Sequence, residues 1–199
     1  ATAWAEGHME RLEGIYKGAR AINPDFVCWV EGVWEGSSQW VDMSQGGFWP
    51  DHPGSEPFPQ LYHYTLPEHP LFGDARLGGV PYWCPSDIGR AKRINAVAGK
   101  LLLEGDFQDD IGLTVDGGGE GHWFRRGKQV VVSVYNPGND RASFNVALKT
   151  VELGRSSLPE SAKALAEADQ QVAPKLAEDT LTFSVSVPGR QVEAVLLEW

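Results

Sequence analysis

The chain has 199 residues, of which 42% are hydrophobic, and its 17 basic and 27 acidic side chains give a net charge of −10. This length and apolar content predict one or two globular domains with a substantial core. The acidic balance argues against nucleic acid and anionic membranes as partners, because phosphate groups are bound by clustered Lys and Arg. No apolar run approaches the roughly 20 residues that a membrane-spanning helix needs.

The first predicted elements are a helix over residues 1–23 and a buried strand over 26–30. Apolar side chains recur every three or four residues as far as Ile22. Asn23-Pro24 then ends the helix, since the residue before a proline avoids the helical conformation. A helix, a tight turn and a short apolar run are typical of an α/β unit that enters a parallel strand. Such a strand needs neighbours, and none is evident upstream.

This predicted strand ends in Glu31, at the position where a barrel strand presents its functional side chains. Gly32 follows and lets a ligand approach the backbone closely. The pattern makes Glu31 the first candidate for a catalytic carboxylate, with Glu35 as the second. The structural alternative is a strand-end carboxylate that caps a turn or pairs with an arginine.

Five of the 8 tryptophans lie between residues 29 and 83, and the stretch 32–60 is rich in Gly, Ser, Pro and aromatic residues. A long loop directly after a strand is usually functional. A core uses Trp sparingly, because the buried indole N–H needs a partner, so this density favours stacking on sugar rings. The alternative is an irregular core wrapped in loops. The candidate substrate-binding residues are Trp34, Trp40, Asp42, Trp49, His63, His69 and Trp83.

The remaining pattern divides the chain into two domains, 1–105 and 106–199. A second strand is predicted over 61–66, and a helix begins at Ser86 as its N-cap and ends at Gly105. Beyond residue 107 the apolar period changes from 3.6 to 2, which predicts a small antiparallel β-sandwich. In that domain only Trp123 and Trp199 are available as sugar platforms.

The order of these features resembles the C-terminal half of (β/α)₈-barrel glycoside hydrolases, loosely grouped with α-galactosidases and α-N-acetylgalactosaminidases. The resemblance rests on the strand that ends in Glu31, the Trp-rich loop, the run Tyr-His-Tyr-Thr-Leu-Pro-Glu at 62–68 and the closing run Val-Glu-Ala-Val-Leu-Leu-Glu at 192–198. A complete barrel takes about 250 residues. We therefore expect the fold class to be α/β plus all-β: a partial (β/α)₈ barrel followed by a β-sandwich.

The resemblance implies hydrolysis of a carbohydrate by two carboxylates that flank the glycosidic bond. Glu31 matches one of them. Its partner is expected on an earlier strand, supplied by an upstream segment of the same protein or by a second subunit, so the isolated chain is expected to be inactive. The alternatives are a non-catalytic carbohydrate-binding or structural module and a protein-interaction module.

No metal and no cofactor are expected, since no H-x-x-x-H or H-E-x-x-H spacing occurs. Cys28 and Cys84 are far apart, and they form either one disulfide or two separate thiols. This leaves the compartment open, with a secreted or periplasmic protein among the options.

Overall fold

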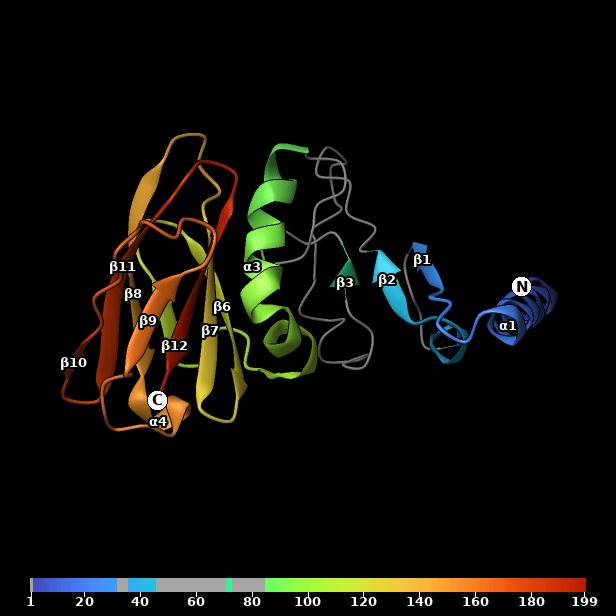
Figure 1. Cartoon of the computed structure of the whole chain (residues 1–199), viewed down its shortest axis with the longest axis horizontal. Helices are drawn as coiled ribbons and strands as arrows, with labels where there is room; N and C mark the ends of the chain where they lie inside the picture. The colour runs from blue at the N-terminus through green and yellow to red at the C-terminus, as the bar shows by residue number, and fades with distance from the viewer. Residues whose placement is uncertain (1, 32–35, 46–70, 73–84) are drawn as a thin grey trace. The chain divides into compact units, whose positions relative to one another are not determined.

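A computed structural model describes residues 2–31, 36–45, 71–72 and 85–199. The chain forms two compact units, Ala1–Gly73 and Asp74–Trp199 (Figure 1). The predicted strand at 61–66 and most of the predicted loop at 32–60 lie outside the described residues. None of the helices within the described ranges has the length and apolarity required to cross a bilayer.

The first unit contains a helix and a small parallel sheet. Helix α1 (Thr2–Ile22) ends just before Asn23-Pro24, as the sequence predicts, and a 3₁₀ turn, η1 (Ser38–Trp40), lies between the first two strands. The sheet has the order β1-β2-β3, and both of its strand pairs are parallel. The strands are β1 (Trp29–Glu31), β2 (Met43–Gln45) and β3 (Leu71–Phe72).

Two details of this unit differ from the expectation. Strand β1 begins three residues later than predicted, because the backbone N–H of Cys28 donates to the carboxylate of Asp42 and not to a neighbouring strand. Its described parallel neighbour is β2, which lies downstream, within the stretch predicted as a loop. The three residues of β2 show no apolar alternation, so nothing in that pattern indicated a strand.

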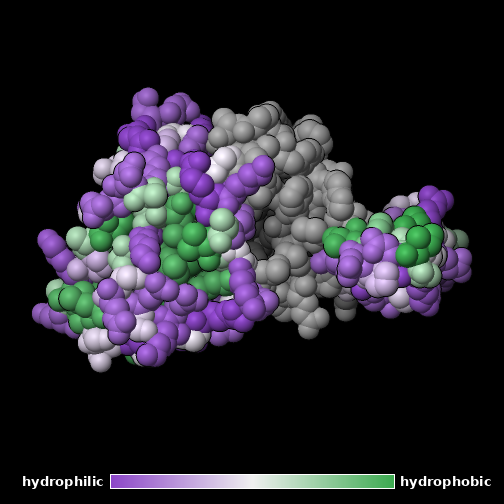
Figure 2. Space-filling model, in the orientation of Figure 1, coloured by the Kyte–Doolittle hydropathy of each residue, from purple (hydrophilic) through white to green (hydrophobic). Residues whose placement is uncertain are grey.

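The surface of the first unit carries exposed apolar side chains. Figure 2 shows hydrophobic residues at the surface of the unit that contains α1. On the helix itself Trp4, Ile15 and Ile22 are exposed, and Val27 is exposed in the turn before β1. Three of these four side chains are therefore exposed along one helix, within the part of the first unit that the structure describes.

The second unit combines one long helix, α3 (Pro85–Glu104), with two antiparallel sheets (Figure 1). One sheet has the order β10-β11-β8-β5, and the other has the order β4-β6-β7-β12-β9. The remaining elements are β4 (Asp106–Phe107), β5 (Leu113–Val115), β6 (Glu120–Arg126), β7 (Gln129–Tyr135), β8 (Ala142–Lys149), α4 (Thr150–Leu153), β9 (Ser161–Ala164), β10 (Lys175–Ala177), β11 (Thr180–Val187) and β12 (Val192–Glu198).

The main core lies between the two sheets of this unit, as expected for a β-sandwich. On β11 every second side chain is buried, and Phe183 is in register with Val146 of β8. From the other sheet, Val132 and Val195 complete the same apolar cluster. The antiparallel architecture that the period of two predicts is therefore present.

Helix α3 covers the outer face of the five-stranded sheet. Its residues Ile94, Ala98 and Leu101 form a second apolar cluster with side chains of β6, β7 and β12, such as Phe124 and Leu196. Because α3 packs on this sheet, the compact unit begins at residue 74, whereas the sequence placed the division between the domains at 105/106. The helix begins at Pro85, one residue before the expected cap, and proline suits the first helical position.

Candidate functional site

Glu31, the main candidate for a catalytic carboxylate, lies at the carboxyl edge of the parallel sheet. Glu31 is the last residue of β1, and Gln45, the last residue of β2, is its register partner. Gln45 is in turn in register with Phe72, the last residue of β3. Neighbouring strands of a sheet lie about 4.8 Å apart, so these three strand ends form one short row. Glu31 and Gln45 thus occupy adjacent register positions at the edge where α/β folds place their ligands.

The opposite, amino edge of the same sheet holds Asp42, which the sequence proposed as a sugar ligand. Its Oδ1 accepts hydrogen bonds from the hydroxyl of Tyr16 at 3.2 Å and from Nη2 of Arg20 at 2.7 Å. Its Oδ2 accepts the backbone N–H of Cys28 at 2.8 Å, and its own N–H donates to the Cys28 carbonyl at 2.8 Å. Asp42 therefore joins helix α1 to the starts of β1 and β2.

Asp42 and Glu31 lie at opposite edges of the parallel sheet. Cys28 and Asp42 directly precede β1 and β2, whereas Glu31 and Gln45 end those strands. Three residues of extended chain span roughly 10 Å. We assign Asp42 a structural role, because its two carboxylate oxygens are already bonded at the edge of the sheet remote from Glu31.

Trp40 belongs to the same structural group. Its ring contacts the edge of Tyr16, with ring centroids 6.1 Å apart, and the Nζ of Lys17 lies 4.9 Å from the ring centroid. The Lys17 ammonium thus occupies one face of the Trp40 ring. Through these contacts with Tyr16 and Lys17, Trp40 packs against helix α1.

The other sequence-predicted site residues are not described by the structure. Of Glu31 only the backbone position is given. Glu35, Trp34, Trp49, His63, His69 and Trp83 lie outside the described residues, and their roles stay predictions.

Cys28 is a buried free thiol, and its possible partner Cys84 also lies outside the described residues. Burial, followed by the nearby Asp42 carboxylate, raises the pKa of the Cys28 thiol. A thiol whose pKa is raised is a poor nucleophile at neutral pH, so Cys28 is part of the packing.

Replacing Asp42 by Ala is expected to destabilise the first unit by about 2 kcal/mol, because Arg20, Tyr16 and the Cys28 N–H all lose their acceptor. Urea denaturation measures the change. Asp25→Ala, which removes an exposed carboxylate from the turn before β1, is the matched control. Equal stability of the two variants would contradict the structural role.

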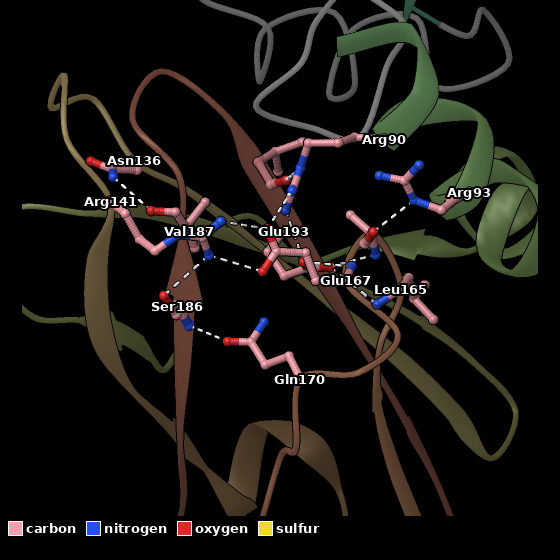
Figure 3. Close-up of polar contacts among 12 residues, drawn as sticks. Arg90, Arg93, Asn136, Arg141, Leu165, Glu167, Gln170, Ser186, Val187 and Glu193 are labelled. Carbon is pink, nitrogen blue, oxygen red and sulfur yellow. Dashed lines mark hydrogen bonds and ion pairs between the residues drawn. The ribbon is translucent and has the colours of Figure 1, made fainter. Parts of the chain in front are cut away.

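The second unit contains a fully buried carboxylate that the sequence did not single out. Glu193 of β12 is 0% exposed, and Nη2 of Arg90 donates to its Oε2 at 2.9 Å (Figure 3). Its two oxygens also accept four backbone N–H groups at 2.7 to 3.1 Å, those of Leu165, Ala166, Glu167 and Ala194. Burial raises the pKa of this carboxyl, whereas the Ala166 amide and the Arg90 guanidinium oppose the rise.

Glu167 extends this group to a second arginine. Arg141 donates to both of its oxygens, from Nη1 at 2.9 Å and from Nη2 at 2.8 Å, and Nη1 of Arg90 donates to Oε1 at 2.8 Å. The Nε of Arg90 donates to the Val192 carbonyl at 3.0 Å. We refer to Arg90, Arg141, Glu167 and Glu193 as the Glu193 network. Because protein donors surround both carboxylates, the network fastens α3 to the sandwich and offers no evident position to a ligand.

The Glu167 carboxyl gives a pH prediction. The Arg141 guanidinium first, and Arg90 with it, lower its pKa from 4.5 to about 2 against the effect of burial. The folded chain thus binds this proton less tightly than the unfolded chain, so the interaction stabilises the fold fully above about pH 4.5 and is lost as the pH falls towards 2. Glu167→Gln should flatten the fall of the unfolding free energy across this window.

Urea denaturation at several pH values between these limits measures that slope. Glu160→Gln, an exposed carboxylate near the same segment, shows whether loss of a charge alone produces the effect. If the slope of Glu167→Gln equals that of the unmodified chain, Glu167 does not stabilise the fold through its ion pairs.

Three further polar or aromatic residues of the second unit hold its loops in place. His122, which is buried on β6, has its Nδ1 2.8 Å from Oδ1 of Asp109. Trp123 is fully buried and donates its Nε1 to the Ile111 carbonyl, so it is not a sugar platform. Trp199 donates its Nε1 to the Ser157 carbonyl. Within the described part of the chain, no group of three or more His, Cys, Asp and Glu side chains could hold a metal ion.

No family model matches the sequence, and no curated protein matches it. Several solved structures of glycoside hydrolases are similar to the chain. An α-amylase from Geobacillus thermoleovorans complexed with acarbose is 16% identical, with a TM-score of 0.37, over 55% of this chain and 22% of the amylase. A GH30 endoxylanase from Clostridium papyrosolvens is 11% identical, with a TM-score of 0.41, over 94% of this chain and 60% of the xylanase.

An α-L-fucosidase from Paenibacillus thiaminolyticus is 12% identical, with a TM-score of 0.33, over 55% of this chain and 18% of the fucosidase. The chain thus spans between 18% and 60% of the lengths of these three enzymes. All three TM-scores are below 0.5, so the functional assignment depends on the residues of the chain itself.

Proposed function

We propose that the chain is part of a glycoside hydrolase in which Glu31 is one of two catalytic carboxylates. The observation that supports this is the position of Glu31 at the end of β1, in a row with the ends of two parallel neighbours. Catalytic residues of (β/α)₈ enzymes come from such strand ends. The resemblance suggests a galactoside or an N-acetylgalactosaminide as the substrate class.

Glycoside hydrolysis requires two carboxyl groups on opposite sides of the scissile bond. One protonates the leaving oxygen, and the other attacks the anomeric carbon or activates a water that does so. In this proposal Glu31 takes one of these roles, with Glu35 as the alternative residue. The second carboxylate comes from another strand of the complete sheet, so the 199-residue chain alone is inactive.

The stretch that follows β1 supplies the substrate contacts in this proposal. Trp34, Trp49 and Trp83 would stack on pyranose faces, where the C–H groups of a sugar meet the aromatic ring. His63 and His69 would form hydrogen bonds with sugar hydroxyls. Trp40 and Asp42 are not included, because both are engaged at the amino edge of the sheet.

A further βα segment, from the same polypeptide or from a second subunit, is proposed as the partner of the first unit. β1 lies at one end of the strand order, and parallel sheets are normally covered on both faces. On α1 the side chains of Trp4 and Ile22 are exposed. A Cβ atom added at Gly7, Gly14 or Gly18 would meet nothing within 4 Å, so the same helix leaves room for close approach.

Proteolysis within α1 should therefore be fast in the isolated chain and slow in the complete assembly.

The experiment that tests the function is a hydrolysis assay on the complete protein that contains this chain. Incubation with a panel of aryl glycosides and oligosaccharides should release sugar from at least one α-galactoside or N-acetylgalactosaminide. If sugar is released only from other glycosides, the proposed hydrolase activity stands and the proposed substrate class is overturned. No release from any of them would overturn the hydrolase proposal.

The second candidate function is a non-catalytic carbohydrate-binding module. The density of tryptophan between residues 29 and 83 favours it, since stacking requires no catalytic pair. Calorimetry with the same oligosaccharides distinguishes the two functions: binding without hydrolysis supports the module, and hydrolysis excludes it. Absence of both would favour a protein-interaction module.

A further inference from the structure

The segment 165–170 connects parts of the second unit that are far apart in sequence. Three of its backbone N–H groups donate to the Glu193 carboxylate of β12. Its Ala166 carbonyl accepts the Nε of Arg93 from α3 at 2.7 Å. Figure 3 shows these contacts converging on one short loop between β12 and α3. We refer to residues 165–170 as the latch segment.

The same segment also reaches the other sheet. Glu167 binds Arg141, which directly precedes β8, and the Oε1 of Gln170 accepts the backbone N–H of Ser186 on β11. The latch segment therefore joins α3, the five-stranded sheet and the four-stranded sheet at one end of the sandwich. Apart from the buried side chains of Leu165 and Ala166, its anchors are polar.

These anchors depend on one another, because most of them share a single acceptor. The N–H groups of Leu165, Ala166 and Glu167 and the guanidinium of Arg90 all donate to Glu193. If the latch segment moves away, Arg90 keeps a buried charge next to a carboxylate that has lost three donors. Such a half-satisfied polar network is unfavourable, which makes separate opening of the segment or of the helix costly.

We propose that the latch segment and the first turns of α3 open and close as one cooperative unit, with Glu193 as the shared fastening point. In the closed state α3 covers the outer face of the five-stranded sheet. In the open state the latch segment and the first turns of α3 leave together, whereas the core between the sheets stays intact. Regions that open as cooperative units below the global unfolding free energy are a general property of proteins.

Hydrogen exchange of the complete 199-residue chain tests this proposal with the variant Glu193→Gln. An amide at this position replaces one acceptor by a donor that faces other donors. We expect the exchange rates of residues 165–167 and of 90–98 in α3 to rise together, by about tenfold or more, a change of about 1.4 kcal/mol or more. Those of 144–148 in β8 should stay within about twofold.

Two further variants make the outcome decisive. Glu198→Gln is the same substitution on the same strand, where the carboxylate pairs with Gln129 and Ser161, and it should leave both regions unchanged. Arg141→Gln removes only the half-exposed ion pair between Arg141 and Glu167, and it should raise the exchange rates of both regions by a smaller factor. This variant keeps the test available if Glu193→Gln fails to fold. A rise in the latch segment without α3, or an equal rise in β8, would overturn the proposal.

Discussion

Replacing Glu193 by Ala should lower the free energy of unfolding by about 3–5 kcal/mol, the range for a buried ion pair that loses one partner. The substitution leaves the buried guanidinium of Arg90 without its charged partner on β12. It also leaves four backbone N–H groups without the acceptor that Glu193 provides, although Leu165 keeps a second bond to the Ala194 carbonyl. Urea denaturation monitored by circular dichroism measures the loss.

The size of this effect can be checked against two other variants. Glu198→Ala removes a carboxylate from the same strand that is part-exposed, and it should cost far less. Arg90→Met should also cost less than Glu193→Ala, because the four backbone N–H groups still bind the carboxylate. A loss below about 1 kcal/mol for Glu193→Ala would contradict the role of the network, since buried unsatisfied groups cost more than this.

Glu31→Gln should reduce kcat by on the order of 10³-fold or more in the complete enzyme, while the fold is retained. Gln has nearly the same shape, but it neither donates a proton as an acid nor attacks as a carboxylate. The measurement is kcat and KM on the glycoside that the unmodified enzyme hydrolyses, and a fall in kcat at unchanged KM identifies a role in the transition state.

The matched control for this variant is Glu10→Gln, which changes an exposed glutamate on α1. Its kcat should equal that of the unmodified enzyme. The parallel variant Glu35→Gln distinguishes the two candidate carboxylates: a large fall in kcat for Glu35 and none for Glu31 would transfer the role to Glu35.

The elements with a strong local signal could be predicted from the sequence. Helix α1 ends where Asn23-Pro24 requires it to end, and the alternation of buried side chains on β11 matches the period of two. Strand β2 could not be predicted, because Met43–Gln45 becomes a strand through its pairing with β1 and β3 and has no apolar pattern of its own.

Strand β12 shows a different limit. A period of two allows only one buried face, but on β12 Val195 and Leu197 lie in the core between the sheets while Val192, Ala194 and Leu196 belong to the cluster with α3. Both sets are buried because α3 covers the outer face. The role of Glu193 was also missed. Glu193 is two residues from Val195 on the same strand, and the sign that could have revealed it was a glutamate within a strand that is apolar on both faces.

The candidate site was predictable only in part. The position of Glu31 at a strand end follows from a short apolar run that stops at a carboxylate. The role of Asp42 does not follow from its neighbours in sequence, because its partners Tyr16, Arg20 and Cys28 are 14 to 26 residues away. A loop aspartate two residues after a tryptophan suits sugar binding and helix anchoring equally well until those partners are known.

Chemical rescue of Glu31→Ala in the complete enzyme tests the catalytic role of Glu31 most directly. The smaller side chain leaves space where a catalytic carboxylate stood, and a small external anion such as azide or formate can take over its role. We expect kcat of this variant to be close to zero and to rise with the concentration of the anion, whereas Glu10→Ala is active and does not respond. Full activity of Glu31→Ala without any anion would contradict the catalytic role of Glu31.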